Sequence, residues 1–478
     1  MTTKKYRKKI KERKRINATR KKKYGGKVFE TGGYGCLFNP PLKCKNINQP
    51  DGVYVTKLMK SKYAKREYDE ILKFEKILKK IPNYDDYFLV KNFELCIPEK
   101  LTKEDLTHFN ENCSALSDDD FNEKNINEKL DDLEAIQMPF GGIDIFDYVY
   151  KINFNNSKMM ELNQTLIDLL KNGIVKMNEL HVYHGDIKDS NVLVSKKGNS
   201  IRARLIDWGL SKIYKDEENI PDAFANRPFQ YNLPFSCILL SRFFRQTCDE
   251  FLKTNPNPSQ SELKEFIDNY LKMKRHFSKH LIHIHRTIQV LFKNEFSVNK
   301  HSGRSLDIKY AYENISNYLL KILEKYIKNG KFHVMEYFKQ VYLKNLDVLG
   351  FVSIYTYFID YIKNKNIKYG IKHFKPQQLN IVNKVKDAYS LLLDSAEKPI
   401  DINTLVEILN DMDPLFNDSL REEFKPKQKS IFKLFDYITG KKMNHSEVIV
   451  EKKNKPNGVS SKKNTTKKIV SNKMKNEI

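Results

Sequence analysis

The segment HVYHGDIKDSNVLV, residues 181–194, constrains this chain more than any other stretch. It carries His184, Asp186, Lys188 and Asn191 at fixed offsets and then continues directly into apolar residues. An ordinary core strand needs none of these four side chains. Transfer of a phosphoryl group can use all of them, to hold phosphate, metal and acceptor hydroxyl. A polar surface loop is the structural alternative. The rest of the chain has to distinguish this loop from a phosphoryl-transfer site.

The pattern around this segment predicts an α+β chain that begins with strands and continues with helices. Residues 24–60 combine short apolar runs with turns, as strands do, and residues 62–80 have apolar side chains at helical spacing. Two further strands, VLVS and RARLID, are predicted directly after the central segment, joined by the turn KKGNS.

Two stretches outside these elements need separate interpretations. Residues 101–132 are rich in Asp, Glu and Asn, which predicts a surface insertion. Residues 344–362 are nearly all apolar but too short to cross a bilayer, so they predict a buried central helix. The pattern from about 240 to 340 is helical and charged and predicts a helical insertion.

The charge of the chain is concentrated at its two ends. Residues 1–23 carry a net charge of +12 and residues 441–478 carry +8, out of +25 for all 478 residues. Both ends have few large apolar residues, so we expect disordered basic arms. Such arms bind polyanions by releasing counterions, which predicts nucleic acid or an acidic protein as a partner. A nuclear-import signal or a solvated tail fits the same composition.

The six cysteines and the first residues indicate a cellular setting. The cysteines are scattered and form no CxxC pair, so we expect neither a zinc site nor a disulfide framework. The first twenty residues are charged and lack the apolar core of a secretory signal. These observations predict an intracellular protein in a reducing compartment, with no membrane partner. The oligomeric state does not follow from the sequence.

The stretch TGGYGCLF, residues 31–38, is a candidate phosphate-binding turn. Gly32, Gly33 and Gly35 would let the backbone approach the phosphates of a nucleotide closely. A plain hairpin turn fits the same residues.

Lys57 lies in the apolar strand VYVTKLM, where a lysine is either an edge residue or a phosphate ligand. Glu67, on the following helix, would hold Lys57 by an ion pair, and Glu70 is the competing candidate. We favour Glu67 because Ile71 and Phe74 fall one and two turns further along its own side of the helix.

The central segment then supplies the remaining parts of a phosphoryl-transfer site. Asp186 would orient the acceptor hydroxyl and take its proton, and Lys188 would neutralise charge on the moving phosphoryl group. Asn191 would hold Mg²⁺, with Asp207 in LIDWGLS as the second ligand. His184 would brace the loop.

These motifs resemble those of the protein-kinase superfamily, and Lys188 resembles the serine/threonine type. HGDIKDSN is similar to the catalytic loop HRDLKxxxN, DWG to DFG, VTK to the strand lysine and GGYGCLF to the glycine-rich loop. The resemblance implies a bilobal kinase-like fold that uses ATP and Mg²⁺, with an N-lobe at 24–136 and a C-lobe at 137–440. It makes Gly32, Gly33, Gly35, Lys57 and Glu67 nucleotide-binding residues.

The resemblance extends to the hinge and to the second half of the chain. MPFGG, residues 138–142, would be the hinge that meets adenine through backbone groups, which involves Met138 and Phe140. The gatekeeper is Gln137 or Met138. Asp347 and Gly350 in DVLGF resemble the anchoring Asp-x-x-Gly of the central helix.

Three departures qualify the resemblance. Glu30 stands where the first loop glycine is expected, and Gly185 stands where the arginine that reads an activation-loop phosphate is expected. An APE motif is absent from the sequence, and NRPFQYNLPFS, residues 226–236, stands in its place. The missing arginine predicts activity without activation-loop phosphorylation.

The leading hypothesis is therefore a serine/threonine protein kinase that transfers the γ-phosphate of Mg-ATP to protein hydroxyls. A small-molecule phosphotransferase of the aminoglycoside or choline type, or a pseudokinase scaffold with polyanion-binding arms, are the alternatives. The layout with lysine-rich tails resembles kinases encoded by giant DNA viruses of the mimivirus type. That resemblance implies a host cytoplasm or nucleus, or packaging in a virion.

Overall fold

The computed structural model describes residues 27–48, 53–151, 156–273, 308–368 and 373–419. The chain divides into one unit of residues 1–426 and another of residues 427–478, and every described residue belongs to the first. The predicted basic arms at 1–23 and 441–478 lie outside the described residues, as do residues 274–307 of the predicted helical insertion.

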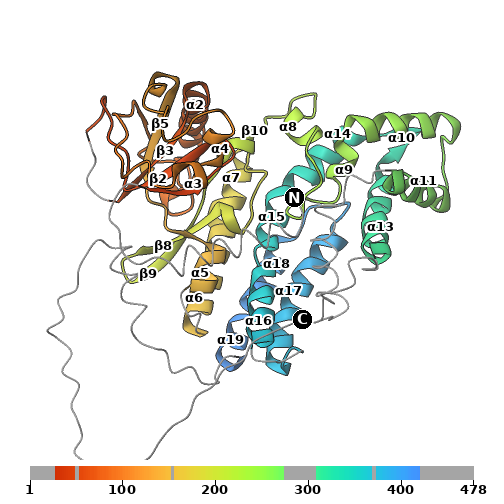
Figure 1. Cartoon of the computed structure of the whole chain (residues 1–478). Coiled ribbons are helices and arrows are strands. Elements are labelled where there is room, and N and C mark those ends of the chain that lie inside the picture. The colour runs from red at the N-terminus through yellow and green to blue at the C-terminus, as the bar shows by residue number, and fades with distance from the viewer. Residues whose placement is uncertain (1–26, 49–52, 152–155, 274–307, 369–372, 420–478) are drawn as a thin grey trace, which may run out of the picture. The chain divides into compact units, whose positions relative to one another are not determined.

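An antiparallel sheet begins the described part of the chain, with the strand order β1-β2-β3-β5-β4 (Figure 1). The strands are β1 (Lys27–Thr31), β2 (Gly35–Asn39), β3 (Tyr54–Lys60), β4 (Glu94–Cys96) and β5 (Leu133–Pro139). The helix α2 (Ser61–Leu78) follows β3 directly and buries Ala64, Ile71, Phe74 and Leu78. These positions are seven, three and four residues apart, so they form one apolar side of the helix. The predicted strands of 24–60 and the predicted helix of 62–80 are confirmed.

The polar stretch predicted as a surface insertion covers one face of this sheet. It contains the short helices α3 (Phe109–Asn112) and α4 (Ser114–Ser117) and a 3-10 turn at Leu130–Asp132. The insertion buries Phe109, Leu116, Phe121 and Ile126 in one apolar cluster with residues of the strands, among them Phe38 and Leu58. The insertion therefore contributes to the core of the sheet as well as to the surface.

Two disulfides fasten the sheet, and the expectation of cysteines without a disulfide framework is wrong. Cys36 of β2 bonds to Cys113 of the insertion, and Cys44 bonds to Cys96 of β4. The partners are 77 and 52 residues apart in the chain. Cys113 lies between α3 and α4 of the insertion, and Cys44 lies after β2, in a stretch that pairs with Pro98 just beyond β4. Cys237 and Cys248 are reduced and buried. The cysteines therefore no longer argue for a reducing compartment.

The middle of the chain joins the sheet to the helices. Strands β6 (Ile143–Asp144), β8 (Val192–Lys197) and β9 (Ser200–Leu205) form a small sheet, and β7 (Val182–Tyr183) pairs with β10 (Lys212–Ile213). The predicted strand pair with its KKGNS turn is β8 and β9. A run of helix leads into this region: α5 (Ile145–Lys151), α6 (Asn156–Asp168), a π-helical turn (Leu169–Ile174) and α7 (Val175–Glu179). The remaining 3-10 turns are Tyr84–Asp86, Asp189–Asn191 and Trp208–Leu210.

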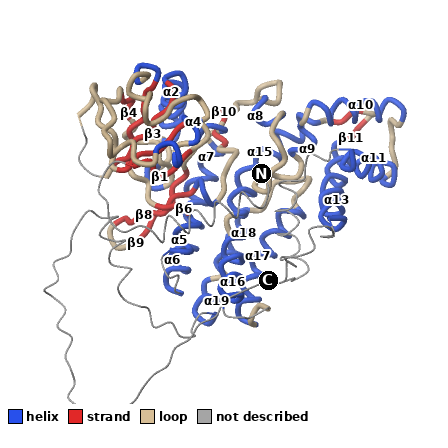
Figure 2. The backbone as a smooth tube through the Cα atoms, viewed as in Figure 1, coloured by secondary structure: helices blue, strands red, loops and turns tan. Residues whose placement is uncertain are grey.

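The rest of the described chain is almost entirely helical, and Figure 2 shows the strands confined mainly to the first half. One group of helices shares an apolar cluster, and it contains α8 (Asp222–Ala225), α9 (Cys237–Leu240), α10 (Arg242–Thr254), α11 (Gln260–Met273), α13 (Ile308–Tyr326), α14 (Val334–Tyr337) and the π-helical turn Phe338–Tyr342. A short hairpin, β11 (Ile327–Lys328) and β12 (Lys331–Phe332), follows α13.

A second group of helices packs with α2 and α6 in the largest cluster. It contains α15 (Leu343–Ser353), α16 (Thr356–Lys368), α17 (Pro376–Asp394), α18 (Ile402–Asn410) and α19 (Asp413–Ser419). The buried helix predicted for 344–362 is thus two helices. Ser353 donates from its hydroxyl to the Gly350 carbonyl oxygen at 2.6 Å, and this competes with the helical hydrogen bond of that carbonyl. Among the described residues, none of the helices is long and apolar enough to cross a membrane.

Candidate active site

A buried aspartate of α15 anchors the segment around Asp186. Asp347 accepts hydrogen bonds from the backbone N–H groups of His184 and Gly185 at 2.9 and 2.7 Å, and from the Asn178 side chain at 2.8 Å. Because three donors converge on one buried carboxylate, the turn at His184–Gly185 has a fixed position relative to α15. Asp347 therefore orients the loop that carries the predicted catalytic residues.

Gly350, one turn later on α15, allows the loop to come this close. A Cβ atom at Gly350 would lie 2.8 Å from the carbonyl oxygen of Ile187, which is shorter than the contacts that Cβ atoms make in proteins. Asp347 and Gly350, the pair predicted for a central helix, thus contact the predicted catalytic loop directly.

His184 braces the loop as a buried, neutral imidazole. Burial lowers its pKa, against the opposing influence of Asp347 and Asp186. Its Nε2 lies 3.0 Å from the Ile206 carbonyl oxygen, and its Nδ1 accepts from the Asp186 backbone N–H at 3.3 Å. Both contacts are satisfied when the proton resides on Nε2.

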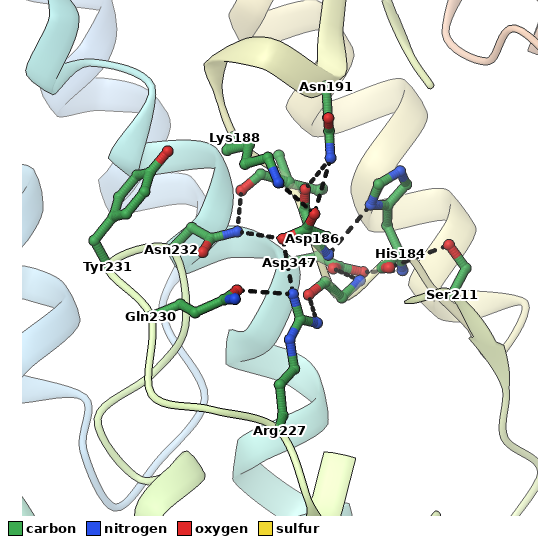
Figure 3. A network of polar contacts seen from close by, with 12 residues as sticks. His184, Asp186, Lys188, Asn191, Ser211, Arg227, Gln230, Tyr231, Asn232 and Asp347 are labelled. Carbon is green, nitrogen blue, oxygen red and sulfur yellow. Dashed lines mark hydrogen bonds and ion pairs between the residues drawn. The ribbon is translucent and has the colours of Figure 1, made fainter. Parts of the chain in front are cut away.

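Asp186 is surrounded by hydrogen-bond donors from two directions (Figure 3). Its Oδ2 accepts from Lys188 Nζ at 2.6 Å and from Asn191 Nδ2 at 3.1 Å. Its Oδ1 accepts from Arg227 Nη2 at 2.7 Å and from Asn232 Nδ2 at 2.9 Å. Burial acts to raise the pKa of Asp186, but Lys188, Arg227 and Asn232 outweigh burial and lower it. The carboxylate is therefore ionised and oriented at neutral pH.

Lys57 and Glu67 form the predicted ion pair. Lys57 Nζ lies 2.7 Å from both carboxylate oxygens of Glu67, so the lysine bridges β3 and α2. Glu67 lies one turn before Ile71 on the side of α2 that packs against the core. Both side chains are largely but not completely buried, with 18% and 27% exposure.

The glycine-rich turn lies next to Lys57. The Gly32 N–H donates to the Gly35 carbonyl oxygen at 2.8 Å, and a Cβ atom at Gly32 would lie 3.9 Å from Lys57 Cε. Gly33 faces open space. Gly35 has a packing role instead, since a Cβ atom there would lie 2.5 Å from the Leu58 carbonyl oxygen. Gly32 and Gly33 therefore form the part of the turn that is free to approach a ligand.

Aromatic side chains connect α2 to the predicted catalytic loop through Trp208. The Trp208 ring lies 5.2 Å from the Phe74 ring of α2 and 5.0 Å from the His184 ring, measured between centroids. Asp207, just before Trp208, has a φ of 66°. Left-handed backbone is unfavourable for a non-glycine residue and is concentrated at functional sites. The packing of Trp208 thus holds Asp207 in a strained and exposed position.

Asn191 and Asp207 offer oxygen ligands of the kind that Mg²⁺ prefers. Asn191 Nδ2 donates to the Asp186 carbonyl oxygen at 2.8 Å, so the amide oxygen of Asn191 is turned away from Asp186. Within the described ranges, no group of three or more His, Cys, Asp or Glu side chains could hold a metal without help. The pair therefore fits a metal that brings further ligands with it, such as nucleotide phosphates.

The strand register separates the two gatekeeper candidates. Met138 pairs with Val55, and Ile136 pairs with Lys57, so these four residues share one face of the sheet. Gln137 pairs with Thr56 on the opposite face and is buried. Met138 is thus the candidate that faces the Lys57 side.

The hinge stretch has fewer free backbone groups than the sequence suggests. The Phe140 N–H donates to the Val53 carbonyl oxygen at 2.8 Å and is not available to an adenine base. The Gly141 carbonyl oxygen accepts from Arg204 at 3.3 Å.

Arg227 and Asn232, which lie in the stretch NRPFQYNLPFS, were not among the predicted site residues. Both are buried and donate to Asp186. The only signal in the sequence is a pair of polar residues among prolines and aromatics, and nothing in that pattern identifies their partner. The contact crosses 41 residues of chain, so it depends on the tertiary fold.

Comparison with known proteins adds little to this geometry. No family model matches the chain. It is 24% identical to the Mediator of RNA polymerase II transcription subunit 26 of Drosophila melanogaster over 197 residues, and it spans 13% of the length of that protein. It also matches a crystal structure of a kinase domain at 12% sequence identity with a TM-score of 0.25, over 45% of this chain and 62% of that one.

Proposed function

We propose that the chain is a phosphotransferase of the protein-kinase type, which moves the γ-phosphoryl group of Mg-ATP to a serine or threonine hydroxyl of a protein. The supporting observation is the joint arrangement of the Lys57–Glu67 ion pair and the Asp186–Lys188–Asn191 loop, linked through Phe74, Trp208 and His184. A scaffold without catalysis has no physical need for this arrangement.

In this proposal, each side chain acts on the nucleotide or on the acceptor. The turn at Gly32 and Gly33 covers the phosphates, and Lys57 contacts them from the face shared with Val55 and Met138. Asn191 and Asp207 hold Mg²⁺, which neutralises negative charge on the phosphates. These roles need no movement of Lys57, because Glu67 already orients it.

The acceptor hydroxyl meets Asp186. The carboxylate is ionised, so it can accept the hydrogen bond of the hydroxyl and align its oxygen with the phosphorus. It then receives the proton as the oxygen–phosphorus bond forms, and ADP leaves. Lys188, 2.6 Å from Asp186, is close enough to balance the negative charge of the transferred group.

The narrower parts of the proposal depend on the sequence alone. Serine/threonine specificity follows from the resemblance at Lys188. The viral setting, in a host cell or a virion, follows from the resemblance to kinases of giant DNA viruses. Binding of nucleic acid or acidic proteins is assigned to the arms at 1–23 and 441–478.

The test is transfer of labelled phosphate from Mg-ATP to a mixture of basic proteins, by the full chain and by Asp186→Asn. We expect transfer by the wild type and a loss of at least about a hundredfold in the variant, with ATP binding retained. ATP binding with no transfer by either would indicate a small-molecule acceptor. No ATP binding by the wild type would overturn the proposal in favour of a scaffold.

A further inference from the structure

The residue before Asp186 is a glycine, and an arginine from a distant segment fills the space beside it. Gly185 has a φ of 68°, in the left-handed region that favours glycine. A Cβ atom there would lie 3.2 Å from Arg227 Nη1 and 3.4 Å from the Leu210 carbonyl oxygen. The absence of a side chain at position 185 thus makes room for the Arg227 guanidinium.

Arg227 bonds to both the backbone and the side chain of the catalytic loop. Its Nη1 donates to the Gly185 carbonyl oxygen, and its Nη2 donates to Asp186 Oδ1 at 2.7 Å. Nη2 also donates to Gln230 Oε1 at 3.2 Å, within the same segment. The side chain of Arg227 is 3% exposed, so these contacts are shielded from water.

Asn232 adds a second contact from the same segment. Its Nδ2 donates to Asp186 Oδ1 at 2.9 Å and to the Ile187 carbonyl oxygen at 3.2 Å. Residues 226–236 thus hold Oδ1 of Asp186, while Oδ2 is left to Lys188 and Asn191 (Figure 3). The contacts of Oδ1 with Arg227 and Asn232 thereby limit the directions in which Oδ2 can point.

A further ion pair lies upstream of residues 226–236, at a side chain that is 81% exposed. Asp216 lies 2.5 Å from Lys339, on the π-helical turn Phe338–Tyr342. No serine or threonine occurs from residue 212 to residue 235. Tyr214 is 2% exposed, and the Tyr231 hydroxyl donates to Asp189 Oδ1 at 3.3 Å. Ser236, at the end of residues 226–236, is buried, so residues 212–236 offer no exposed serine or threonine to a modifying enzyme.

We propose that Arg227 is a positioning residue, which holds residues 226–236 against the catalytic loop and orients Asp186 without any phosphorylation of the segment. This inference rests on the proposed function, because it assigns the regulation of the same site. Arg227 would act through Asp186 and would not touch the substrate or the nucleotide.

The experiment compares wild type, Arg227→Gln, Arg227→Lys and the control Arg242→Gln in the full chain. Arg242 begins α10, is exposed and carries the same charge. Each protein is treated with phosphatase and assayed for kcat, for KM of ATP and for ATP affinity. Hydrogen exchange of residues 226–236 and of 184–191 is measured on the same samples.

For Arg227→Gln we expect kcat to fall about a hundredfold, as for a catalytic group displaced by about 1 Å, with ATP affinity unchanged. Arg227→Lys should recover part of the rate, because lysine supplies the charge but not the two-pronged geometry. Wild type and Arg242→Gln should keep their rate after phosphatase. Exchange in residues 226–236 should speed up in Arg227→Gln alone.

Four results would overturn the inference. They are an unchanged or faster rate in Arg227→Gln, a parallel loss of ATP affinity, no recovery in Arg227→Lys, and a wild type inactivated by phosphatase. A faster rate would mean that the guanidinium blocks Asp186 instead of orienting it. If wild type transfers no phosphate, the proposed function fails, and unchanged exchange in Arg227→Gln would then overturn the positioning role separately. If Arg227→Gln does not fold, the rate and the hydrogen exchange are both measured on Arg227→Lys.

Discussion

Cys113 is bonded to Cys36, and Cys36 directly follows Gly35, so the end of the glycine-rich turn is covalently tied to the insertion that covers the sheet. Replacing both cysteines with serine should lower the free energy of unfolding by about 4 kcal/mol, because the bond closes a loop of 77 residues in the unfolded chain. It should also weaken ATP binding, since β2 positions Gly32 and Gly33. Thermal unfolding and ATP titration measure the two effects.

The disulfide Cys44–Cys96 provides the matched control. It closes a loop of 52 residues in the same sheet but is not adjacent to the turn. Its removal should lower Tm by a similar amount and leave ATP affinity unchanged. Equal losses of affinity in the two double variants would contradict a specific link between the first disulfide and the turn.

Glu67→Gln should lower kcat/KM by at least about tenfold, which corresponds to about 1.4 kcal/mol of transition-state stabilisation. The reason is that Lys57 loses the carboxylate that orients it at 2.7 Å. Glu70→Gln removes the same charge three residues away, outside the Lys57 pair, and should keep nearly the full rate. Steady-state kinetics with Mg-ATP compare the two variants. Equal losses of kcat/KM in Glu67→Gln and Glu70→Gln would show that the Lys57–Glu67 pair has no role in turnover.

Gly350→Ala should destabilise the protein by about 1–3 kcal/mol, since its methyl group would lie 2.8 Å from the Ile187 carbonyl oxygen. The helix α15 or the catalytic loop has to move to relieve this contact. Gly33→Ala is the comparison for stability, because nothing lies within 4 Å of its added methyl group. Thermal melts that fail to separate the two variants would contradict the close approach of α15 to the loop.

The stability of the protein should fall steeply between pH 10 and pH 12, partly because of Tyr318. Burial raises the pKa of Tyr318 to about 12, whereas an unfolded tyrosine ionises near 10. The unfolded state therefore loses its proton first, and the stabilisation present below pH 10 is lost as the pH rises to 12. The two-unit difference corresponds to about 3 kcal/mol at most.

Tyr318→Phe should flatten this alkaline decrease, when denaturant unfolding is followed from pH 8 to pH 12. Tyr34→Phe, at a side chain that is 55% exposed, should leave the slope as in the wild type. A slope that does not change in Tyr318→Phe would mean that Tyr318 ionises equally easily in both states.

Periodic patterns of apolar residues correctly predicted individual strands and helices, whose geometry depends on neighbouring residues in the chain. Strand alternation and helical spacing identified the strands around Lys57 and the helix that carries Glu67, and the 3.6-residue period favoured Glu67 over Glu70. The apolar run at 344–362 revealed burial but not the interruption at Ile354 and Tyr355, where the hydroxyls of Ser353 and Thr356 donate to backbone carbonyl oxygens.

The contacts that the sequence did not reveal join residues far apart in the chain. The disulfides depend on the packing of the insertion against β2 and on the pairing of the stretch after β2 with Pro98, just beyond β4. Arg227 reaches Asp186 only because residues 226–236 return to the catalytic loop. Neither pairing leaves a periodic or spaced signature, so composition and motif spacing cannot predict it. The assignment of residues 101–132 to the surface failed in part for the same reason, since burial of Phe109 depends on the neighbouring strands.

The absence of serine and threonine from residues 212–235 has a consequence for how such an enzyme would be controlled. Its working geometry would be completed when the chain folds. An upstream enzyme could not switch this geometry on or off by phosphorylating a serine or threonine of this segment. The output would then depend on how much of the protein is made, where it is retained and which substrates it meets there.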